Sequence, residues 1–443
     1  MRSPRPQHRR PGDRRDRPAA PPGLAARQGA VTLVAAVLDR GRMLDEAALD
    51  GRALAPAERA EARGLAHLTL RRLGQIDDLL ARFAERPPPS PADHVLRVMT
   101  GAIVFGGTAP HAAVDLAVRQ VKAQRGTARL AGLVNAVGRR IAAEGRALAE
   151  AQDAAELNAP EWLARAMAAD WGADAARAMA EAHLGTPPVD LTPKAADGAG
   201  ALAEALGADL LPTGTLRLAA RGQMTALPGF AEGAWWAQDA AAALPARLIP
   251  EPEGKRVLDL CAAPGGKTLQ LAAAGARVTA LDISERRMER LAENLERTGL
   301  AAEPVVADAL DWEPEAPFDA ILLDAPCTAT GTIRRHPDLP WRAGAGETVA
   351  LLDLQARLLE RAYGWLAPGG ALVYAVCSLL RAEGEGQVAR FLAATPGARA
   401  EPLGAELPAE LTDAEGNLRT RPDLWAERGG LDGFFAARIR RPA

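Results

Sequence analysis

The stretch VLDLCAAPGGK, from Val257 to Lys267, decides the fold predicted for this chain. An apolar run of strand length breaks at Pro264 to Gly266, and an amphipathic segment follows, which is the order strand, glycine turn, helix. Two adjacent glycines let a ligand approach the backbone closely, and the amides of the following helix point at it. The next apolar run, VTALD, ends at Asp282, whose carboxylate can accept hydrogen bonds from both hydroxyls of a ribose. The sequence therefore predicts a strand–helix–strand unit that binds a nucleotide-like cofactor.

The residues of the turn narrow the choice of cofactor. The triphosphate-binding loop GxxxxGK[ST] requires glycine at position 261, where this chain has Cys261. The dinucleotide pattern GxGxxG fails because Gly265 and Gly266 are adjacent and Leu269 stands where the third glycine belongs. S-adenosylmethionine, which carries a ribose and no phosphate, fits the turn better. The simpler alternative is a tight turn without a ligand, as in any α/β protein.

The composition limits the class of protein. The chain has 443 residues, enough for two or three domains, and 53 basic against 56 acidic residues give a net charge of -3, so any nucleic-acid surface must be a local patch. Three cysteines, at positions 261, 327 and 377, lack metal-ligand spacing, and we expect free thiols in a reducing compartment and no metal. No apolar run approaches the roughly 18 residues of a membrane span, and no apolar signal core follows the Arg-rich N-terminus. We therefore expect a cytoplasmic protein without membrane contacts, and a monomer.

Four segments are predicted along the chain. Residues 1–24 are rich in Arg and Pro and should form a disordered tail, which is either a weak RNA-attracting arm or a solvated extension. Residues 25–145 carry apolar residues at helical spacing and predict a bundle of at least five helices. Residues 146–240 form a connecting subdomain, and residues 241–443 form an α/β domain.

The helical segment has a basic side that needs an explanation. Its members are Arg119, Lys122, Arg125, Arg129, Arg139 and Arg140. Such a side is usually just solvated.

The connecting subdomain contains two adjacent tryptophans, followed closely by two polar residues: Trp235, Trp236, Gln238 and Asp239. These residues could cap the mouth of a cofactor site. Two adjacent Trp more often anchor a hydrophobic core.

Strands and helices alternate from about residue 256 onward. The predicted strands are VLDL, RVTALD, EPVVAD, FDAILLDAP and ALVYAVCS, and the segments between them are helical. This alternation predicts a parallel sheet wrapped on both faces by right-handed crossovers, with ligands at the carboxyl ends of the strands. Asp259, Asp282, Asp308 and Asp324 lie at or near these ends. Four such carboxylates in succession favour a binding site over four separate helix caps.

Two cysteines, Cys327 and Cys377, follow two of the predicted strands. If these strands are neighbours, their axes lie about 4.8 Å apart and both thiols can face one pocket. A thiolate suits attack on carbon 6 of a pyrimidine, because it is a strong nucleophile that can leave again after carbon 5 has taken a methyl group. A free cysteine thiol has a pKa near 8.5 and is therefore mostly protonated at neutral pH. The site must help to deprotonate the attacking thiol. Spacing alone does not choose which cysteine attacks, and a lone cysteine at a strand end is more often a small buried hydrophobe.

Two families resemble parts of this sequence. The stretches TAPHAAVDLAV and AGLVNAVGRR are similar to the NusB-type RNA-binding domain, which implies that the basic side of the helical segment is an RNA surface. Residues 229–392 resemble the RNA 5-methylcytosine methyltransferases of the RsmB/Sun and NOL/NOP/Sun group. Together they imply an all-α NusB-like bundle followed by a Rossmann-like class I methyltransferase domain. The implied activity is methylation of carbon 5 of a cytosine in RNA, most simply small-subunit ribosomal RNA.

The resemblance also implies roles for individual residues. Cys377 matches the nucleophile, Cys327 matches the cysteine that promotes product release, and Asp324 lies between cofactor and target base. The residues implied to hold S-adenosylmethionine are Cys261, Ala262, Ala263, Pro264, Gly265, Gly266, Lys267, Asp282, Asp308 and Asp324. The chain departs from the family pattern after Cys377, where RAEGEGQV replaces a common Pro-Glu-Glu stretch, and at residues 187–194, which lack the usual Arg-x-Asn.

Three other functions stay open at the level of sequence. The first is the same chemistry on transfer RNA. The second is a non-catalytic RNA-binding or ribosome-assembly factor, and the third, a small-molecule methyltransferase, would not need the helical segment. Arg334, Arg335 and His336, in the loop after Cys327, are further candidates to hold RNA phosphates.

Overall fold

The computed structural model describes residues 21–47, 49, 54–84, 86–124, 126–218, 222–342 and 345–443, with only the backbone at 345–347 and 405. Residues 1–20 of the predicted tail and Arg125 of the predicted basic side lie outside the described residues. Among the described helices, none combines the length and the apolarity needed to cross a lipid bilayer.

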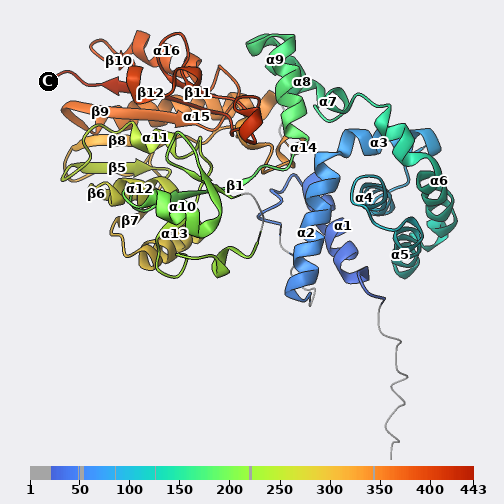
Figure 1. Cartoon of the computed structure of the whole chain (residues 1–443). Helices are drawn as coiled ribbons and strands as arrows, with labels where there is room; N and C mark the ends of the chain where they lie inside the picture. The colour runs from blue at the N-terminus through green and yellow to red at the C-terminus, as the bar shows by residue number, and fades with distance from the viewer. Residues whose placement is uncertain are drawn as a thin grey trace, which may run out of the picture.

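The N-terminal part is a helical domain, as predicted. Its helices are α1 (Leu24–Leu38), α2 (Pro56–Arg71), α3 (Leu73–Phe83), α4 (Ala92–Val104), α5 (Pro110–Ala123) and α6 (Ala131–Glu150). Pro110 is the first residue of α5, where its missing N–H costs nothing and its fixed φ suits a helix start. One apolar stripe of each helix faces a common core that includes Leu33, Leu70 and Ile141. These helices stand at one end of the molecule (Figure 1).

The connecting part contains helices and a small sheet. The helices are α7 (Ala154–Leu157), α8 (Glu161–Trp171), α9 (Ala173–His183) and α10 (Ala199–Leu206). Among the described residues, four short antiparallel strands pair in the order β2-β3-β1-β4: β1 (Val189–Pro193), β2 (Ala208–Leu210), β3 (Leu216–Leu218) and β4 (Trp235–Ala237). Trp235 and Trp236 are buried, so both serve as core anchors and not as a cap. Gln238 bonds to Gln270 of the following domain.

The C-terminal part is built on a second sheet, with β5 near its middle. Its main path runs β10-β12-β9-β8-β5-β6-β7, with β11 paired to β12. The strands are β5 (Arg256–Leu260), β6 (Arg277–Asp282), β7 (Glu303–Val306), β8 (Phe318–Asp324), β9 (Leu366–Val376), β10 (Arg399–Glu401), β11 (Leu418–Thr420) and β12 (Phe434–Arg440). The five predicted strands, β5 to β9, are parallel, as expected. The strand β12 is antiparallel to β9, which the sequence analysis missed.

Helices cover both faces of this sheet. They are α11 (Leu244–Arg247), α12 (Gly266–Ala273), α13 (Glu285–Thr298), α15 (Ala345–Gly364) and α16 (Glu385–Ala394), and α14 (Leu339–Arg342) lies in the loop after β8. Alternate residues of the strands enter two separate apolar clusters. Val257 and Leu322 belong to one, whereas Leu258 and Leu323 belong to the other. Burial on both faces explains why these strands read as continuous apolar runs.

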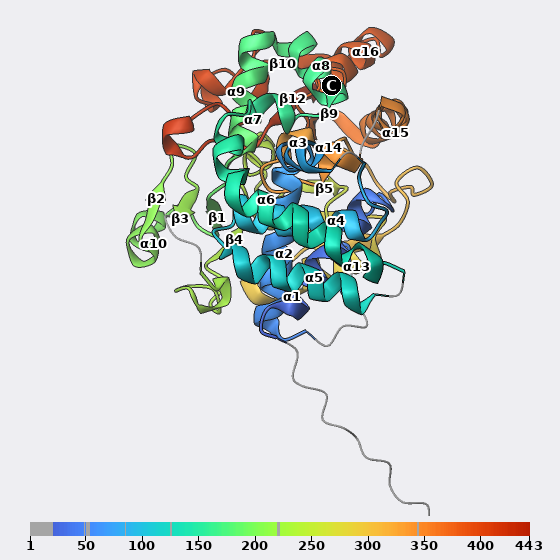
Figure 2. The ribbon, with the colours of Figure 1, turned by 90° about the vertical axis from the view of Figure 1, so that its right-hand side faces the viewer.

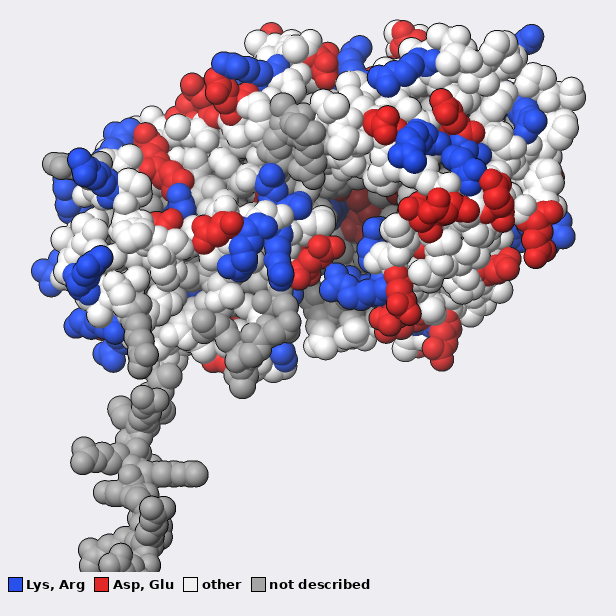
Figure 3. Space-filling view, turned by 180° about the vertical axis from the view of Figure 1, so that it is seen from behind, with Lys and Arg blue, Asp and Glu red and all other residues white. Residues whose placement is uncertain are grey.

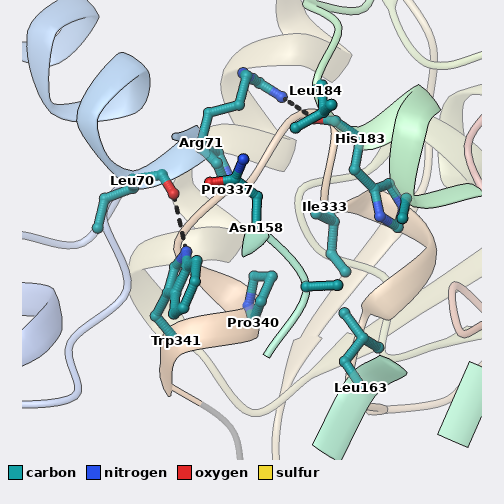
Figure 4. A pocket seen from close by; sticks show the side chains of 12 residues that line it. Leu70, Arg71, Asn158, Leu163, His183, Leu184, Ile333, Pro337, Pro340 and Trp341 are labelled. Atoms are coloured by element: carbon teal, nitrogen blue, oxygen red, sulfur yellow. Dashed lines mark hydrogen bonds between the residues drawn. The ribbon is translucent and has the colours of Figure 1, made fainter. Parts of the chain in front are cut away.

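The carboxyl ends of the parallel strands point toward the helical domain (Figure 1), which stands in front of that edge in Figure 2. The loop after β8 connects the two parts. The Leu44 amide donates to Asp338 Oδ2 at 3.0 Å, and the Trp341 indole donates to the Leu70 carbonyl at 2.9 Å. Around this contact lies a small cavity of about 20 Å³, lined in part by His183, the last residue of α9, and by Leu184 directly after it (Figure 4). The carboxyl ends of the parallel strands, where ligands are expected to bind, therefore lie next to the N-terminal helical domain.

Candidate functional site

The conformation of the glycine turn that follows β5 is constrained by close packing against α13. Cys261 has a φ of 64° and Gly265 a φ of 105°, both in the left-handed region. A Cβ at Gly265 would lie 2.8 Å from Leu291 Cγ of α13, so close packing between turn and helix already requires glycine there. The Ala262 amide donates to the Leu281 carbonyl at 3.0 Å, which ties the turn to β6. The turn therefore holds a set shape at the carboxyl edge of the sheet.

Asp282, the last residue of β6, is linked to the same turn. Its carboxylate is buried and accepts hydrogen bonds from the amides of Ala263 at 3.1 Å and Ser284 at 2.9 Å. A carboxylate offers about four lone-pair sites, so acceptor capacity is left for ribose hydroxyls. Two apolar side chains are exposed beside it: Ile283 at 68% and Val306, opposite Asp282 in the register of β6 and β7, at 52%. This exposed pair was not predicted, although Ile283, an apolar residue directly after a strand-end carboxylate, is a usable signal in the sequence.

Asp308 lies in the loop after β7, at the same edge. It is exposed, and its Oδ1 accepts a hydrogen bond from the Leu310 amide at 2.9 Å. Its side chain therefore stabilises a turn, whatever else it binds.

Asp259 occupies a different environment from the other carboxylates. It is fully buried within β5 and accepts a hydrogen bond from Thr268 Oγ1 at 2.6 Å, while its Oδ1 has no partner among the described residues. Burial, partly offset by the Thr268 hydrogen bond and by Lys267, raises the pKa of Asp259 to about 7. This carboxyl group therefore exchanges its proton near neutral pH.

Lys267 and Asp324 form an ion pair at the centre of the edge. Lys267 Nζ of α12 lies 2.8 Å from Asp324 Oδ2 at the end of β8. Burial works to lower the pKa of Lys267, but the charge and hydrogen bond of Asp324 outweigh it, and the pKa is raised. The negative charges of Asp259 and Cys377 also contribute to that rise, so the ammonium lies within electrostatic range of Cys377.

The two cysteines that the sequence singled out meet in the structure. Cys377 directly follows β9, Cys327 follows β8, and the two strands are parallel neighbours. Their Sγ atoms lie 3.5 Å apart. The predicted proximity of the two thiols is confirmed, because the register of β8 and β9 places both strand ends side by side.

The surroundings of the two thiols differ in charge. The pKa of Cys327 is raised well above its usual value, first by its hydrogen bond to Cys377, then by burial and by the negative charges of Cys377 and Glu383. The ammonium of Lys267, in contrast, lies near Cys377. Burial also raises the pKa of the third cysteine, Cys261, in the turn. The surroundings of Cys327 therefore disfavour its ionised form.

The prediction that Arg334 and Arg335 hold RNA phosphates is wrong. Arg334 is buried and donates to Asp432 Oδ1 at 3.0 Å, and Arg335 donates to Asp432 Oδ2 at 2.8 Å and also to Asp239. Carboxylates that are distant in the sequence neutralise both guanidinium groups, which spacing along the chain does not reveal. His336 Nδ1 lies 3.3 Å from Asp45 Oδ2 and takes part in the contact between the domains.

Comparisons with known proteins agree with this architecture. Residues 246–440 match the family described as 16S rRNA methyltransferase RsmB/F, and residues 24–143 match the NusB family. The ribosomal RNA small subunit methyltransferase B of Xanthomonas campestris pv. campestris is 38% identical over 440 residues, covering 94% of this chain and 97% of that protein. The protein of the same name from Klebsiella pneumoniae is 37% identical over 389 residues, covering 84% and 87%.

Two solved structures share the fold. The crystal structure of PH0851 superposes with a TM-score of 0.73 at 22% identity, covering 95% of this chain and 99% of that one. A methyltransferase homologue from Pyrococcus horikoshii superposes with a TM-score of 0.54 at 27% identity, covering 62% and 93%.

Proposed function

This chain belongs to the family of 16S rRNA methyltransferases RsmB/F, and on that premise we propose that it methylates carbon 5 of a cytosine in small-subunit ribosomal RNA, in the cytoplasm. Its methyl donor is S-adenosylmethionine. The observation that carries the proposal is the pair of thiols, Cys327 and Cys377, 3.5 Å apart at the carboxyl edge of the sheet. Methylation of an exocyclic nitrogen needs no such pair, whereas methylation of carbon 5 needs a reversible nucleophile.

The residues at the edge fit the cofactor. Ile283 and Val306 expose apolar surface suited to an adenine, and Asp282 between them has acceptor capacity for the ribose. We propose that the turn from Cys261 to Gly266, with Lys267, Asp282, Asp308 and Asp324, holds S-adenosylmethionine. When bound, this group supplies an electrophilic methyl at the strand ends.

We assign the role of nucleophile to Cys377. Its thiolate would add to carbon 6 of the cytosine, which moves electron density to carbon 5. Carbon 5 would then bond the methyl group as the sulfur–methyl bond of the donor breaks and the donor leaves as a neutral thioether. Loss of the proton from carbon 5 then re-forms the carbon 5–carbon 6 double bond, and the carbon–sulfur bond breaks to return the Cys377 thiolate.

Cys327 and Asp324 complete the site in this proposal. Cys327, whose raised pKa favours its protonated form, lies within contact of the Cys377 sulfur and assists release of the product. Asp324 is positioned by Lys267 at the end of β8 and can accept a hydrogen bond from the amino group of a cytosine. A uracil presents no donor at that position, so Asp324 would favour cytosine.

We propose that the helical domain, residues 25–145, binds the RNA that carries this cytosine. Arg119, Lys122, Arg129, Arg139 and Arg140 of its basic side are exposed. In Figure 3, Lys and Arg side chains gather over the end of the molecule formed by the helical domain, and the surface is hollowed where the two parts meet. The connecting subdomain, residues 146–240, and the catalytic domain, residues 241–443, lie beyond that hollow from the helical domain.

Identification of the methylated nucleoside tests the function. The protein would be incubated with S-adenosylmethionine and either small-subunit ribosomal RNA or transfer RNA, and each RNA digested and analysed by mass spectrometry. We expect 5-methylcytidine from the ribosomal RNA and none from the transfer RNA. Methylation of transfer RNA would favour the first alternative, another methylated nucleoside would refute carbon 5 chemistry, and no methylation of either RNA would favour a binding factor.

A further inference from the structure

A buried carboxylate lies directly behind the two cysteines. Glu383 is 0% exposed and sits in the loop between β9 and α16, six residues after Cys377. Its Oε1 accepts hydrogen bonds from the Thr328 amide at 2.9 Å and from Gln355 Nε2 at 3.0 Å. Its Oε2 accepts hydrogen bonds from Thr328 Oγ1 at 2.5 Å and from Ser378 Oγ. All four contacts come from neutral donors.

These contacts join the neighbours of both thiols. Thr328 follows Cys327 and Ser378 follows Cys377, so one side chain holds the loop after β8 to the loop after β9. The main chain of Glu383 is fixed in turn, because its carbonyl accepts a hydrogen bond from the Tyr374 hydroxyl of β9 at 2.6 Å. The separation of the two sulfurs is therefore set by a shared anchor and not by the strands alone.

The charge of this anchor also matters. A carboxylate without a cation among its direct donors is costly to bury, and an amide or hydroxyl could brace two loops at a lower cost. Its negative charge acts on the thiol of Cys327, whose ionised form it disfavours, whereas the Lys267 ammonium acts on Cys377. Glu383 therefore contributes to the difference between the two thiols as well as to their distance.

We propose that Glu383 is a positioning residue that sets the separation of the Cys327 and Cys377 sulfurs by holding the loops after β8 and β9 together. The proposal rests on the proposed function for its catalytic consequence, but its effect on the thiols exists without RNA.

The test compares thiol reactivity with catalysis. Alkylation of Cys327 and Cys377 by iodoacetamide would be followed by peptide mass spectrometry from pH 6 to pH 10, without RNA, in the full-length protein. In Glu383→Gln we expect the curve of Cys327 alkylation rate against pH to move about one pH unit lower, because a negative charge near the thiol is lost. The kcat for RNA methylation should fall about 10- to 100-fold with KM for RNA unchanged, because misplacement of reacting groups by less than 1 Å has effects of this size. Glu360→Gln, an exposed residue of α15, is the matched control and should change neither quantity.

The outcomes separate this proposal from the proposed function. A Cys327 profile and a kcat equal to those of the wild type and of Glu360→Gln would overturn it. A shifted profile in a protein that methylates no cytosine would leave the positioning role intact and refute the function. If Glu383→Gln does not fold, Ser378→Ala and Thr328→Val carry the test, since each removes one hydroxyl donor and should lower kcat. Wild-type kcat in both would contradict the proposal.

Discussion

At the residue scale, charged side chains surround the two chemically similar thiols of the site, Cys327 and Cys377. Lys267 and Asp324 form a partly buried ion pair within range of Cys377, while Glu383 faces the loop of Cys327. The two thiols are close enough to touch, and the negative charge of Glu383 acts on Cys327. The choice of Cys377 as nucleophile, which spacing along the chain left open, is part of the proposal.

Asp259 gives a pH-dependent prediction at the same scale. Its pKa is raised to about 7 by burial, against about 3.9 in an unfolded chain. Between these values the folded protein binds a proton that the unfolded chain releases, so the contribution of Asp259 to stability is present at low pH and is lost as the pH rises to 7. Relative to Asp259→Asn, the wild type should lose about 3 kcal/mol of unfolding free energy between pH 5 and pH 8.

Urea unfolding of both proteins at the two pH values measures this difference. Asp311→Asn, at an exposed position, is the control and should track the wild type. A difference between wild type and Asp259→Asn that does not change with pH would mean that Asp259 is ionised throughout.

At the element scale, the turn between β5 and α12 combines two demands on Gly265. Its φ of 105° is strained for any side chain, and a Cβ would lie 2.8 Å from Leu291 Cγ. We expect Gly265→Ala to lower the unfolding free energy by about 1–3 kcal/mol and to weaken binding of S-adenosylmethionine, because the turn must shift away from α13.

Denaturant unfolding and calorimetric titration with the cofactor measure these two effects. Gly64→Ala is the matched control, since this residue of α2 has open space around it and should gain up to about 1 kcal/mol. Equal behaviour of the two variants would show that the turn tolerates a side chain.

Much of the element order followed from the sequence, for reasons that are local. The strands β5, β6, β8 and β9 are mostly buried and therefore appear as apolar runs, and Pro110 marks the start of α5. The strand β12 was missed because strand–helix alternation predicts parallel neighbours only. The strands β1 to β4 are three to five residues long, too short for periodicity to identify.

Site residues whose position follows from nearby sequence could be predicted, whereas residues whose contacts come from distant parts of the chain could not. The turn, Asp282 and both cysteines follow directly from strand ends, whose positions apolar runs reveal. Arg334 and Arg335 were misread because their partners, Asp432 and Asp239, lie about 95 or more residues away. Glu383 escaped notice for the same reason, since its contact with Thr328 depends on the pairing of β8 with β9.

At the scale of the whole molecule, the domains meet at the catalytic edge. Contacts from Leu44 and Leu70 to the loop after β8 keep the helical domain beside the strand ends. The basic side on α5 and α6 lies at the end of the molecule away from the sheet (Figure 1), so an RNA held there must extend past the helical domain to reach the thiols.

The basic side gives a prediction at this scale. Lys122, Arg129 and Arg139 are exposed on the helical domain. Reversing all three to Glu should weaken RNA binding at least about 10-fold and make it less sensitive to salt, by about 0.7–0.9 in the slope of log K against log salt for each lost phosphate contact. Filter binding over a salt series measures both quantities. Arg390→Glu, an exposed charge reversal on α16, is the control, and an equal loss of affinity in that variant would argue against a local RNA surface.

In the proposed mechanism, Cys377 bonds covalently to the target cytosine and Cys327 assists its release. The most direct measurement is mass spectrometry of the protein after incubation with S-adenosylmethionine and small-subunit ribosomal RNA, comparing wild type, Cys327→Ala and Cys377→Ala. We predict that a protein–RNA adduct accumulates in Cys327→Ala, with the bond on the Cys377 peptide, and that Cys377→Ala forms neither adduct nor methylated RNA. An adduct in Cys377→Ala with its bond at Cys327, or methylated RNA from Cys377→Ala, would contradict the claim.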